Sequence, residues 1–282
     1  MNSAQTGAAS VAALELSAAH QGFGNVLAAE FGRIVKNKLT IITAAVCIVV
    51  AVGFAYALYA MSGFGVDSTG ENIVMGNPTA DGVLSGLSVI GGTLALFFGL
   101  YAATFAAREY SSGVNRATLL LVPKRSRLLA ARLLLWAALG ALVGAVSFVL
   151  AYALLVLAGG HGAEVAGDML VLRAAACVLV CMLACLLACS IGTLLRGGAL
   201  SVLAFLLAQI LLGMLLSILA GILPGVIGEA LSQVSSYVFG AATEIMGNAT
   251  ALGEFLGALA TAVVWVVVFS LLGAASFRKY NG

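Results

Sequence analysis

Residues 174–223 read AAACVLVCMLACLLACSIGTLLRGGALSVLAFLLAQILLGMLLSILAGIL, two apolar runs that are separated by Arg196 and two glycines. Neither run contains a charged residue or a histidine. A helix needs roughly 20 apolar residues to cross the hydrocarbon core of a bilayer, and each run is long enough. The stretch therefore predicts two membrane-spanning helices that are joined by a short turn.

The composition of the whole chain agrees with this pair of spans. Of the 282 residues, 62% are hydrophobic and only 9% are charged, and the mean hydropathy is +1.14. A water-soluble domain usually has about 25% charged residues, and its buried area grows too slowly with size to hide so much apolar surface. The composition excludes a soluble enzyme, a disordered protein and a secreted disulfide scaffold.

The chain contains four further apolar runs of this kind, so we expect an all-α integral membrane protein with six transmembrane helices. The connections differ in character. Residues 62–82 are polar and Gly-rich and predict an irregular external loop, whereas 224–254 predict short amphipathic helices in a re-entrant-like external loop. We treat 23–282 as a single transmembrane domain. The expected spans are 39–61, 83–107, 133–158, 174–195, 199–223 and 255–277.

The charged residues fall on the two sides of the membrane very unequally. One side receives twelve of the thirteen Lys and Arg residues and three acidic residues, a net charge of +9. The other side receives Arg173 and eight acidic residues, a net charge of −7. Basic residues mark cytoplasmic loops. We therefore expect a multi-pass protein of a bacterial plasma membrane with both termini in the cytoplasm.

The segment before the first span has an amphipathic pattern. Phe23, Leu27, Phe31 and Ile34 recur at spacings of three or four, with Arg33 elsewhere on the helical wheel. This predicts an interfacial helix on the inner leaflet whose basic residues face anionic headgroups. The alternative is a loosely ordered basic lead-in to the first span. We expect 1–22 to be a disordered cytoplasmic tail.

Ionisable side chains are missing from the interior of the predicted spans. Proton relays and voltage sensors need such groups, and an intramembrane protease would need paired Asp residues or an H-E-x-x-H motif. We expect no catalytic residue, cofactor or metal site on this chain. The net charge of +2 also gives no reason to expect nucleic-acid binding.

Small residues form stripes on several spans. Cys177, Cys181, Cys185 and Cys189 recur every four residues, and a rise of about 1.5 Å per residue places the outer two about 18 Å apart. One metal ion cannot take all four, so we interpret them as small residues that let helices approach closely. Glycine and alanine ladders on the second, third and sixth spans favour close packing too, within the bundle or between protomers. These ladders include Gly91, Ala95, Gly99, Ala103, Ala107, Gly140, Gly144, Gly253 and Gly257.

The cytoplasmic connection at 108–132 reads REYSSGVNRATLLLVPKRSRLLAAR. A segment that only fixes topology needs positive charge and little else. This one also has Glu109 and Tyr110 at the membrane edge and a TLLLVP run at 118–123. Apolar residues on a wet loop are typical of a docking surface.

This connection resembles that of the permease subunits of the ABC-2 type of ATP-binding-cassette (ABC) transporters. The resemblance lies in an acidic residue and a glycine after the second span, a Thr-Leu-Leu run, a proline among basic and Ser-Arg residues, and a basic residue that opens the third span. It extends to the amphipathic helix around Glu30 to Lys38 and to the loop between the last two spans. The chain departs from the family pattern at Val114 and Arg132, where Thr and Lys are more common. The matching residues are Glu109, Gly113, Thr118 to Leu120, Pro123 to Arg127, and Arg132.

The resemblance implies the membrane-spanning subunit of an ATP-driven exporter. Two permease subunits, identical or homologous, would form the pathway in the bilayer, and two separate ABC ATPase subunits would bind beneath them. The chain has no G-x-x-x-x-G-K-[ST] loop, so ATP and Mg²⁺ would be held by the partner and this chain would not be an enzyme. The alternatives are a non-transporting scaffold or sensor subunit of such a complex, or a passive channel. The ATPase-coupling residues that the resemblance implies are Glu109, Tyr110, Gly113, Asn115, Arg116, Thr118, Pro123, Arg125 and Arg127.

Overall fold

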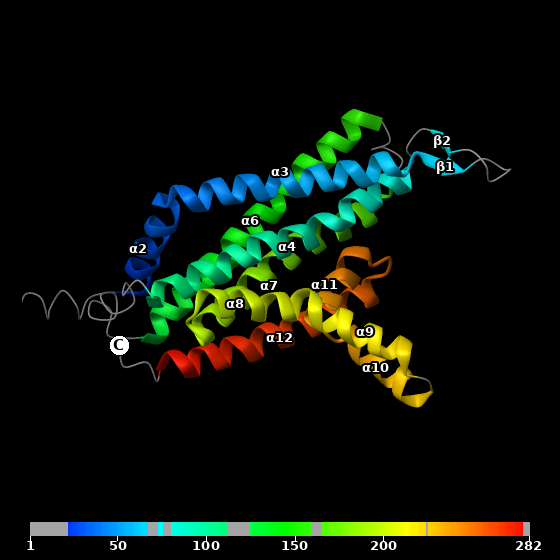
Figure 1. The fold of residues 1–282 in the computed structure, drawn as a ribbon. Coiled ribbons are helices and arrows are strands. Elements are labelled where there is room, and N and C mark those ends of the chain that lie inside the picture. The colour runs from blue at the N-terminus through cyan, green and yellow to red at the C-terminus, as the bar shows by residue number, and fades with distance from the viewer. Residues whose placement is uncertain are drawn as a thin grey trace, which may run out of the picture.

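The computed structural model describes residues 22–66, 73–75, 80–111, 125–159, 165–223 and 225–278. Within these ranges six helices are long and apolar enough to cross a membrane, so the protein is an all-α, multi-pass membrane protein, as predicted (Figure 1). Five of the six spans are single α-helices, and the fifth span along the chain contains a π-helical turn. The spans are α3 (Lys38–Met61), α4 (Ala80–Ser111), α6 (Arg125–Gly159), α7 (Gly167–Leu195), α8–η2–α9 (Gly198–Leu206, Leu207–Leu211, Leu212–Ile222) and α12 (Leu252–Arg278).

The two ends of the bundle differ in charge. The basic end, which carries Lys38, Arg108, Arg127 and Arg196, lies beside α2 (Phe23–Lys36). The opposite end, which we call the acidic end, carries Asp81, Asp168, Glu229, Glu244 and Glu254. All six spans run between these two ends (Figure 1), so the charge asymmetry of the sequence becomes a difference between two faces of the molecule.

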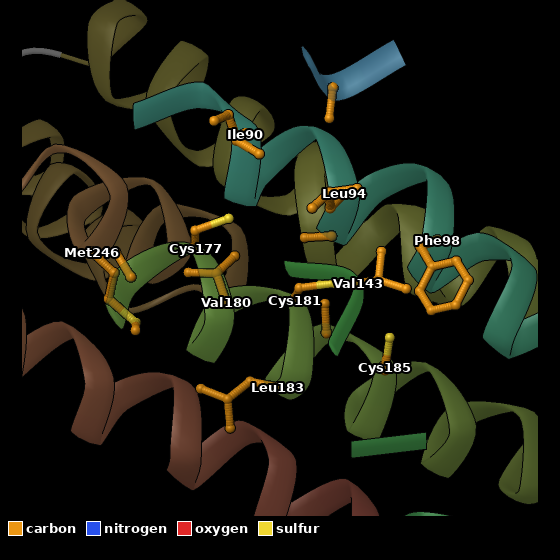
Figure 2. Close-up of a cluster of buried hydrophobic side chains, with 14 of the residues drawn as sticks. Ile90, Leu94, Phe98, Val143, Cys177, Val180, Cys181, Leu183, Cys185 and Met246 are labelled. Carbon is orange, nitrogen blue, oxygen red and sulfur yellow. The ribbon is translucent and has the colours of Figure 1, made fainter. Parts of the chain in front are cut away.

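Helix α7 is the centre of the bundle. It packs against α4, α6 and α12. In its most apolar stretch of 18 residues 67% of the residues are buried, compared with 17% in the corresponding stretch of the peripheral helix α3. Figure 2 shows Cys177 and Cys181 of α7 close to Ile90 and Leu94 of α4. Small side chains at the centre let the neighbouring backbones approach closely, which is the main way that helices gain packing energy in lipid.

Two glycines on α6 lie directly against the backbone of α7. A Cβ atom added at Gly140 would lie 2.8 Å from the carbonyl oxygen of Cys181, and one at Gly144 would lie 3.0 Å from that of Cys177. The interpretation of the cysteines as packing residues is confirmed here, since all are buried and free. By contrast, Gly253 and Gly257 of α12 have no atom within 4 Å of that position in the described part of the chain.

Helices α4 and α6 extend further at the basic end than we predicted. Helix α6 begins at Arg125 instead of 133, so the last residues of the predicted 108–132 connection are helical. The reason is packing: Leu128, Leu129 and Ala131 are buried in a small apolar cluster with residues of α2, α4 and α12. An apolar stripe on an otherwise basic sequence continues the helix beyond the apolar span.

The acidic end carries the connecting elements. A two-stranded antiparallel hairpin, β1 (Phe64–Val66) with β2 (Ile73–Met75), lies in the loop for which we had predicted irregular structure. Helices α10 (Val226–Ser236) and α11 (Phe239–Asn248) confirm the short helices predicted between the last two spans. Helix α10 packs back on α9, whereas α11 packs among α4, α7 and α12.

Arg173 of α7 fixes α11 to the bundle. Its guanidinium donates hydrogen bonds to the backbone carbonyl oxygens of Gly247 and Asn248, the latter at 3.2 Å. These carbonyls end α11, where a cation is favoured by the helix dipole. The indole of Trp265 in α12 also donates to the carbonyl oxygen of Tyr237 at 2.8 Å. Two side chains from different spans thus position this helix.

The close approach of α6 to α7 makes a testable prediction. We expect Gly140→Leu to lower the free energy of unfolding by about 1–3 kcal/mol, because the new side chain would overlap the backbone of α7. The measurement is denaturant unfolding of the purified protein in detergent. The matched control is Gly257→Leu, which places the same side chain on a surface without neighbours in the described chain and should leave the midpoint unchanged. Equal midpoints for both variants would contradict the packing argument.

Candidate functional site

Helix α2 has one buried face and one exposed apolar face. Val26, Glu30 and Ile34 are buried against the bundle, and α2 lies alongside the beginning of α6. Phe31 and Val35 are 57% and 44% exposed and form an apolar face that suits the membrane interface. The helix is confirmed as amphipathic, but the predicted single apolar face is divided between the bundle and the exposed surface, with Phe23 exposed, Leu27 half-buried and Ile34 buried.

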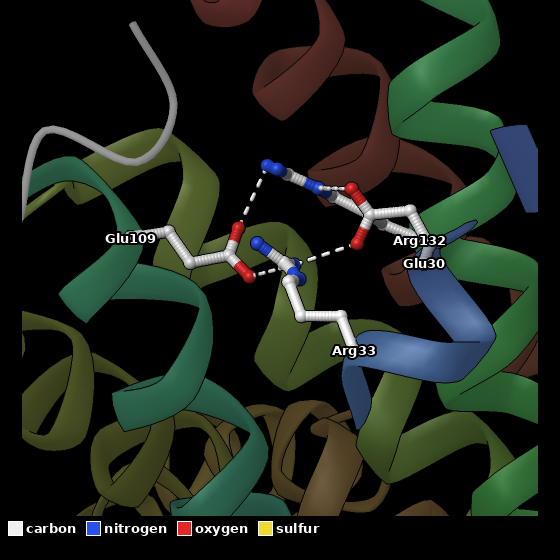
Figure 3. A network of polar contacts seen from close by, with 4 residues as sticks. All are labelled: Glu30, Arg33, Glu109 and Arg132. Atoms are coloured by element: carbon white, nitrogen blue, oxygen red, sulfur yellow. Dashed lines mark hydrogen bonds and ion pairs between the residues drawn. The ribbon is translucent and has the colours of Figure 1, made fainter. Parts of the chain in front are cut away.

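Four charged side chains from α2, α4 and α6 meet where these three helices lie together (Figure 3). Glu30 and Arg33 belong to α2, Glu109 to the last turns of α4, and Arg132 to α6. Their ion pairs close a ring in which carboxylates and guanidiniums alternate, which we call the charge ring. The Arg33–Glu30 pair is 2.6 Å, the Arg132–Glu109 pair 2.7 Å and the Arg132–Glu30 pair 3.4 Å, and Arg33 also pairs with Glu109.

The ring is shielded from solvent and has no net charge. The side chains of Arg132, Glu30 and Glu109 are only 3%, 5% and 9% exposed, whereas that of Arg33 is 30% exposed. Removing charges from water is expensive, and mutual attraction offsets that cost only while every partner is in place. The ring therefore contributes specificity more than net stability: it favours the one arrangement of α2, α4 and α6 that pairs all four charges.

The position of Arg33 corrects one expectation. We predicted that the basic residues of α2 face anionic headgroups, but Arg33 turns inward to Glu30 and Glu109. Its guanidinium also lies 5.8 Å from the centre of the Phe105 ring, within the range of a cation–π contact. The reason is that two buried carboxylates would share the single guanidinium of Arg132, and the site would keep a net negative charge, if Arg33 stayed in the headgroup region.

Tyr110, the neighbour of Glu109, faces a different set of helices. Its ring lies edge-on to Phe277 of α12, with centroids 6.5 Å apart, and the guanidinium of Arg196 lies 5.8 Å from its centre. Arg196 ends α7 in a left-handed conformation (φ 59°) and donates to the carbonyl and hydroxyl oxygens of Ser276 at 2.7 and 2.8 Å. The end of α4 is thereby joined to the α7–α8 turn and to α12.

The two residues together make the last turn of α4 a junction. Glu109 reaches α2 and α6, while Tyr110 reaches α7 and α12. Both side chains are buried, so each has a role inside the chain itself. Their contact with an ATPase stays a prediction.

The other predicted coupling residues are only partly described. Arg125 begins α6 and Arg127 is exposed on its first turns. Gly113, Asn115, Arg116, Thr118 and Pro123 lie outside the described residues, as does the 1–21 part of the predicted tail. The structure therefore places the two ends of the 108–132 connection and leaves the assignment of its middle as a prediction.

Comparisons with known proteins identify no relative: no protein-family model and no curated protein matches the chain. Among the described residues, no group of three or more His, Cys, Asp and Glu side chains is arranged to hold a metal ion. The site must therefore be interpreted from its own chemistry, which is that of a neutral, buried ion-pair network between helix ends.

Sequence reasoning missed two of the arginines that organise this molecule. The sequence shows Arg196 only as a basic residue at a turn and does not reveal its αL conformation or its contact with Tyr110. It shows Arg173 only as the exception to the charge asymmetry. Its isolation at the acidic end was the available signal, because a lone arginine at the edge of an apolar span needs acceptors within the protein.

The charge ring makes a prediction about stability. We expect Glu109→Gln and Arg132→Met each to destabilise the protein by about 3–5 kcal/mol, because each leaves the buried ring with an uncompensated charge. The double variant should cost less than the sum of the two, since it removes both members of a pair. The measurement is a double-mutant cycle of denaturant unfolding in detergent, with the exposed carboxylate variant Glu229→Gln as control. Additive effects of the two substitutions would contradict the ring.

Proposed function

We propose that this chain is the membrane-spanning subunit of an ATP-driven export complex. Two copies, or this chain and a homologous permease, form the pathway, and two separate ATPase subunits bind at the basic end. The excess of basic residues supports a cytoplasmic location for that end. The observation that carries the proposal is the charge ring, because it connects α2 to both helices that flank residues 112–124.

The ring and Tyr110 support a route by which force could spread. A partner that displaces the 112–124 segment acts on the ends of α4 and α6. The ring makes α2 follow these ends, since separation would strand buried charges. Tyr110 and Arg196 extend the same displacement to α7, α8 and α12. Packed helices move as rigid bodies in such transitions, so a local push becomes a tilt of the bundle.

The residues of the membrane spans favour a transporter that takes its energy from a partner protein. The described spans contain a π-helical turn and scattered hydroxyl groups, but no ion-pair chain that crosses from one end to the other within the described residues. The sequence has no phosphate-binding loop. A transporter without such an ion-pair chain and without a phosphate-binding loop takes its energy from a partner that hydrolyses ATP.

The coupling segment can be tested by substitution. We expect Arg116→Glu, Arg125→Glu and Gly113→Pro to insert normally into the membrane, because none lies within a predicted apolar span. Each should reduce ATP hydrolysis by the reconstituted complex to the level of the ATPase subunits alone. The measurement compares phosphate release in liposomes for the wild type, the three variants and Lys279→Glu, a charge-reversal control at the C-terminus.

Two outcomes separate the proposal from its alternatives. Loss of stimulation in the three variants, with Lys279→Glu unaffected, supports the coupling role. Unchanged stimulation in all three variants removes the coupling assignment, and solute movement by the chain reconstituted without an ATPase favours a passive channel.

A further inference from the structure

A cavity of about 480 Å³ lies toward the acidic end, between α3, α4, η2 and α11. Its polar lining includes Thr93, Gln209, Thr243 and Glu244. Its apolar lining includes Phe54 and Phe97, which are 55% and 44% exposed and so form its outer rim. The volume is in the range of sites for small organic ligands, which combine apolar walls with a few placed polar groups.

The cavity reaches the middle of the membrane-spanning region. Gln209 is the twelfth of the 25 residues in the Gly198–Ile222 span, and Thr93 is the thirteenth of the 30 in Asp81–Tyr110. Glu244 belongs to α11, the short helix that packs among the spans from the acidic end. The cavity therefore connects a carboxylate near one end of the bundle with an amide at mid-depth.

Gln209 occupies an unusual backbone and has one unused polar atom. It lies in η2, where the N–H of Leu212 bonds to the carbonyl of Leu207, five residues earlier, and π-helical turns of this kind are frequent at functional sites. Its Nε2 donates to the hydroxyl of Thr243 at 3.3 Å, and that hydroxyl donates to the carbonyl of Gly240 at 2.8 Å. Its carbonyl Oε1 is buried and has no hydrogen-bond partner among the described residues.

The charge on the cavity wall is negative and comes from Glu244. Glu244 is exposed on its wall and makes no ion pair with any residue in the described ranges. Arg173, the one basic residue assigned to this end, is held by the carbonyl oxygens of Gly247 and Asn248. The Glu244 carboxylate is a charged hydrogen-bond acceptor, so the complementary group is a cation that carries N–H donors.

We propose that this cavity binds an amphipathic protonated amine. The ammonium group would donate to the Glu244 carboxylate, and the apolar body of the ligand would lie between Phe54 and Phe97. That such an amine is the cargo rests on the export function proposed above, whereas the site itself does not. A bare metal ion is a poor alternative because no trio of His, Cys, Asp or Glu is assembled in the described part of the chain.

The test uses dansylcadaverine, a primary amine with a fluorescent aromatic body, and its N-acetyl derivative, which keeps the body but lacks the charge. Each is titrated against the full chain in lipid nanodiscs, and the fluorescence with empty nanodiscs is subtracted. The variants are Glu244→Gln and Gly92→Leu. Gly92 lines the cavity and has no atom within 4 Å of an added Cβ, so leucine fills the space without a backbone clash.

We expect saturable binding of dansylcadaverine and none of the acetylated form. Glu244→Gln should weaken binding by about tenfold, as expected for loss of a charge-assisted hydrogen bond, and Gly92→Leu should abolish it. The matched control Glu229→Gln, a carboxylate at the same end outside this cavity, should bind as the wild type does. Unfolding midpoints equal to the wild type confirm that each variant is folded.

Three results would overturn the proposal: no saturable binding to the wild type, equal affinity in Glu244→Gln, or equal binding of the acetylated form. The assay contains no ATPase, so its failure leaves the coupling proposal standing. Conversely, if the chain binds the amine but stimulates no ATPase, the export function fails and the binding site remains.

Discussion

The arrangement of the basic end depends on the need to compensate three buried charges and one that is partly buried. Glu30, Arg33, Glu109 and Arg132 come from three helices, and each carboxylate is paired with both guanidiniums. Surface ion pairs contribute little, but a buried pair that loses one member is strongly destabilised. The ring therefore restricts how α2, α4 and α6 can separate. Helix packing through Gly140 and the small residues of α7 holds the rest of the bundle with weaker directionality.

The molecule thus has two differently constructed ends. At the basic end, Glu109 and Tyr110 connect the last turn of α4 to the neighbouring helices. At the acidic end, Arg173 holds α11 beside a π-helical turn and an electronegative cavity. A partner that acts at one end and a ligand that binds at the other would be linked by α4, which contributes Glu109 to the ring and Thr93 to the cavity wall.

The sequence predicted the six spans, the amphipathic helix and the packing role of the cysteines, because apolar run length and helical periodicity are local properties. It did not predict the early start of α6, since Leu128 and Leu129 are buried by residues distant in the chain. It also placed Arg33 at the headgroups. A helical wheel shows only neighbours within one helix, so it cannot show that Arg33 pairs with Glu109, which is 76 residues away in the sequence. Charge positions were readable from sequence, whereas charge partners depended on tertiary structure.

The most direct test of the charge ring measures how α2 is held against α6. Spin labels at the exposed positions Ala29 and Ala130 report that distance by double electron–electron resonance in nanodiscs. The native cysteines Cys47, Cys177, Cys181, Cys185 and Cys189 are all buried and would be replaced by alanine. The charge ring predicts one narrow distance distribution in this background and in Glu229→Gln, and a broad or longer one in Glu30→Gln, which removes the direct ion pair between α2 and α6. An unchanged narrow distribution in Glu30→Gln would show that the charge ring does not hold these helices together.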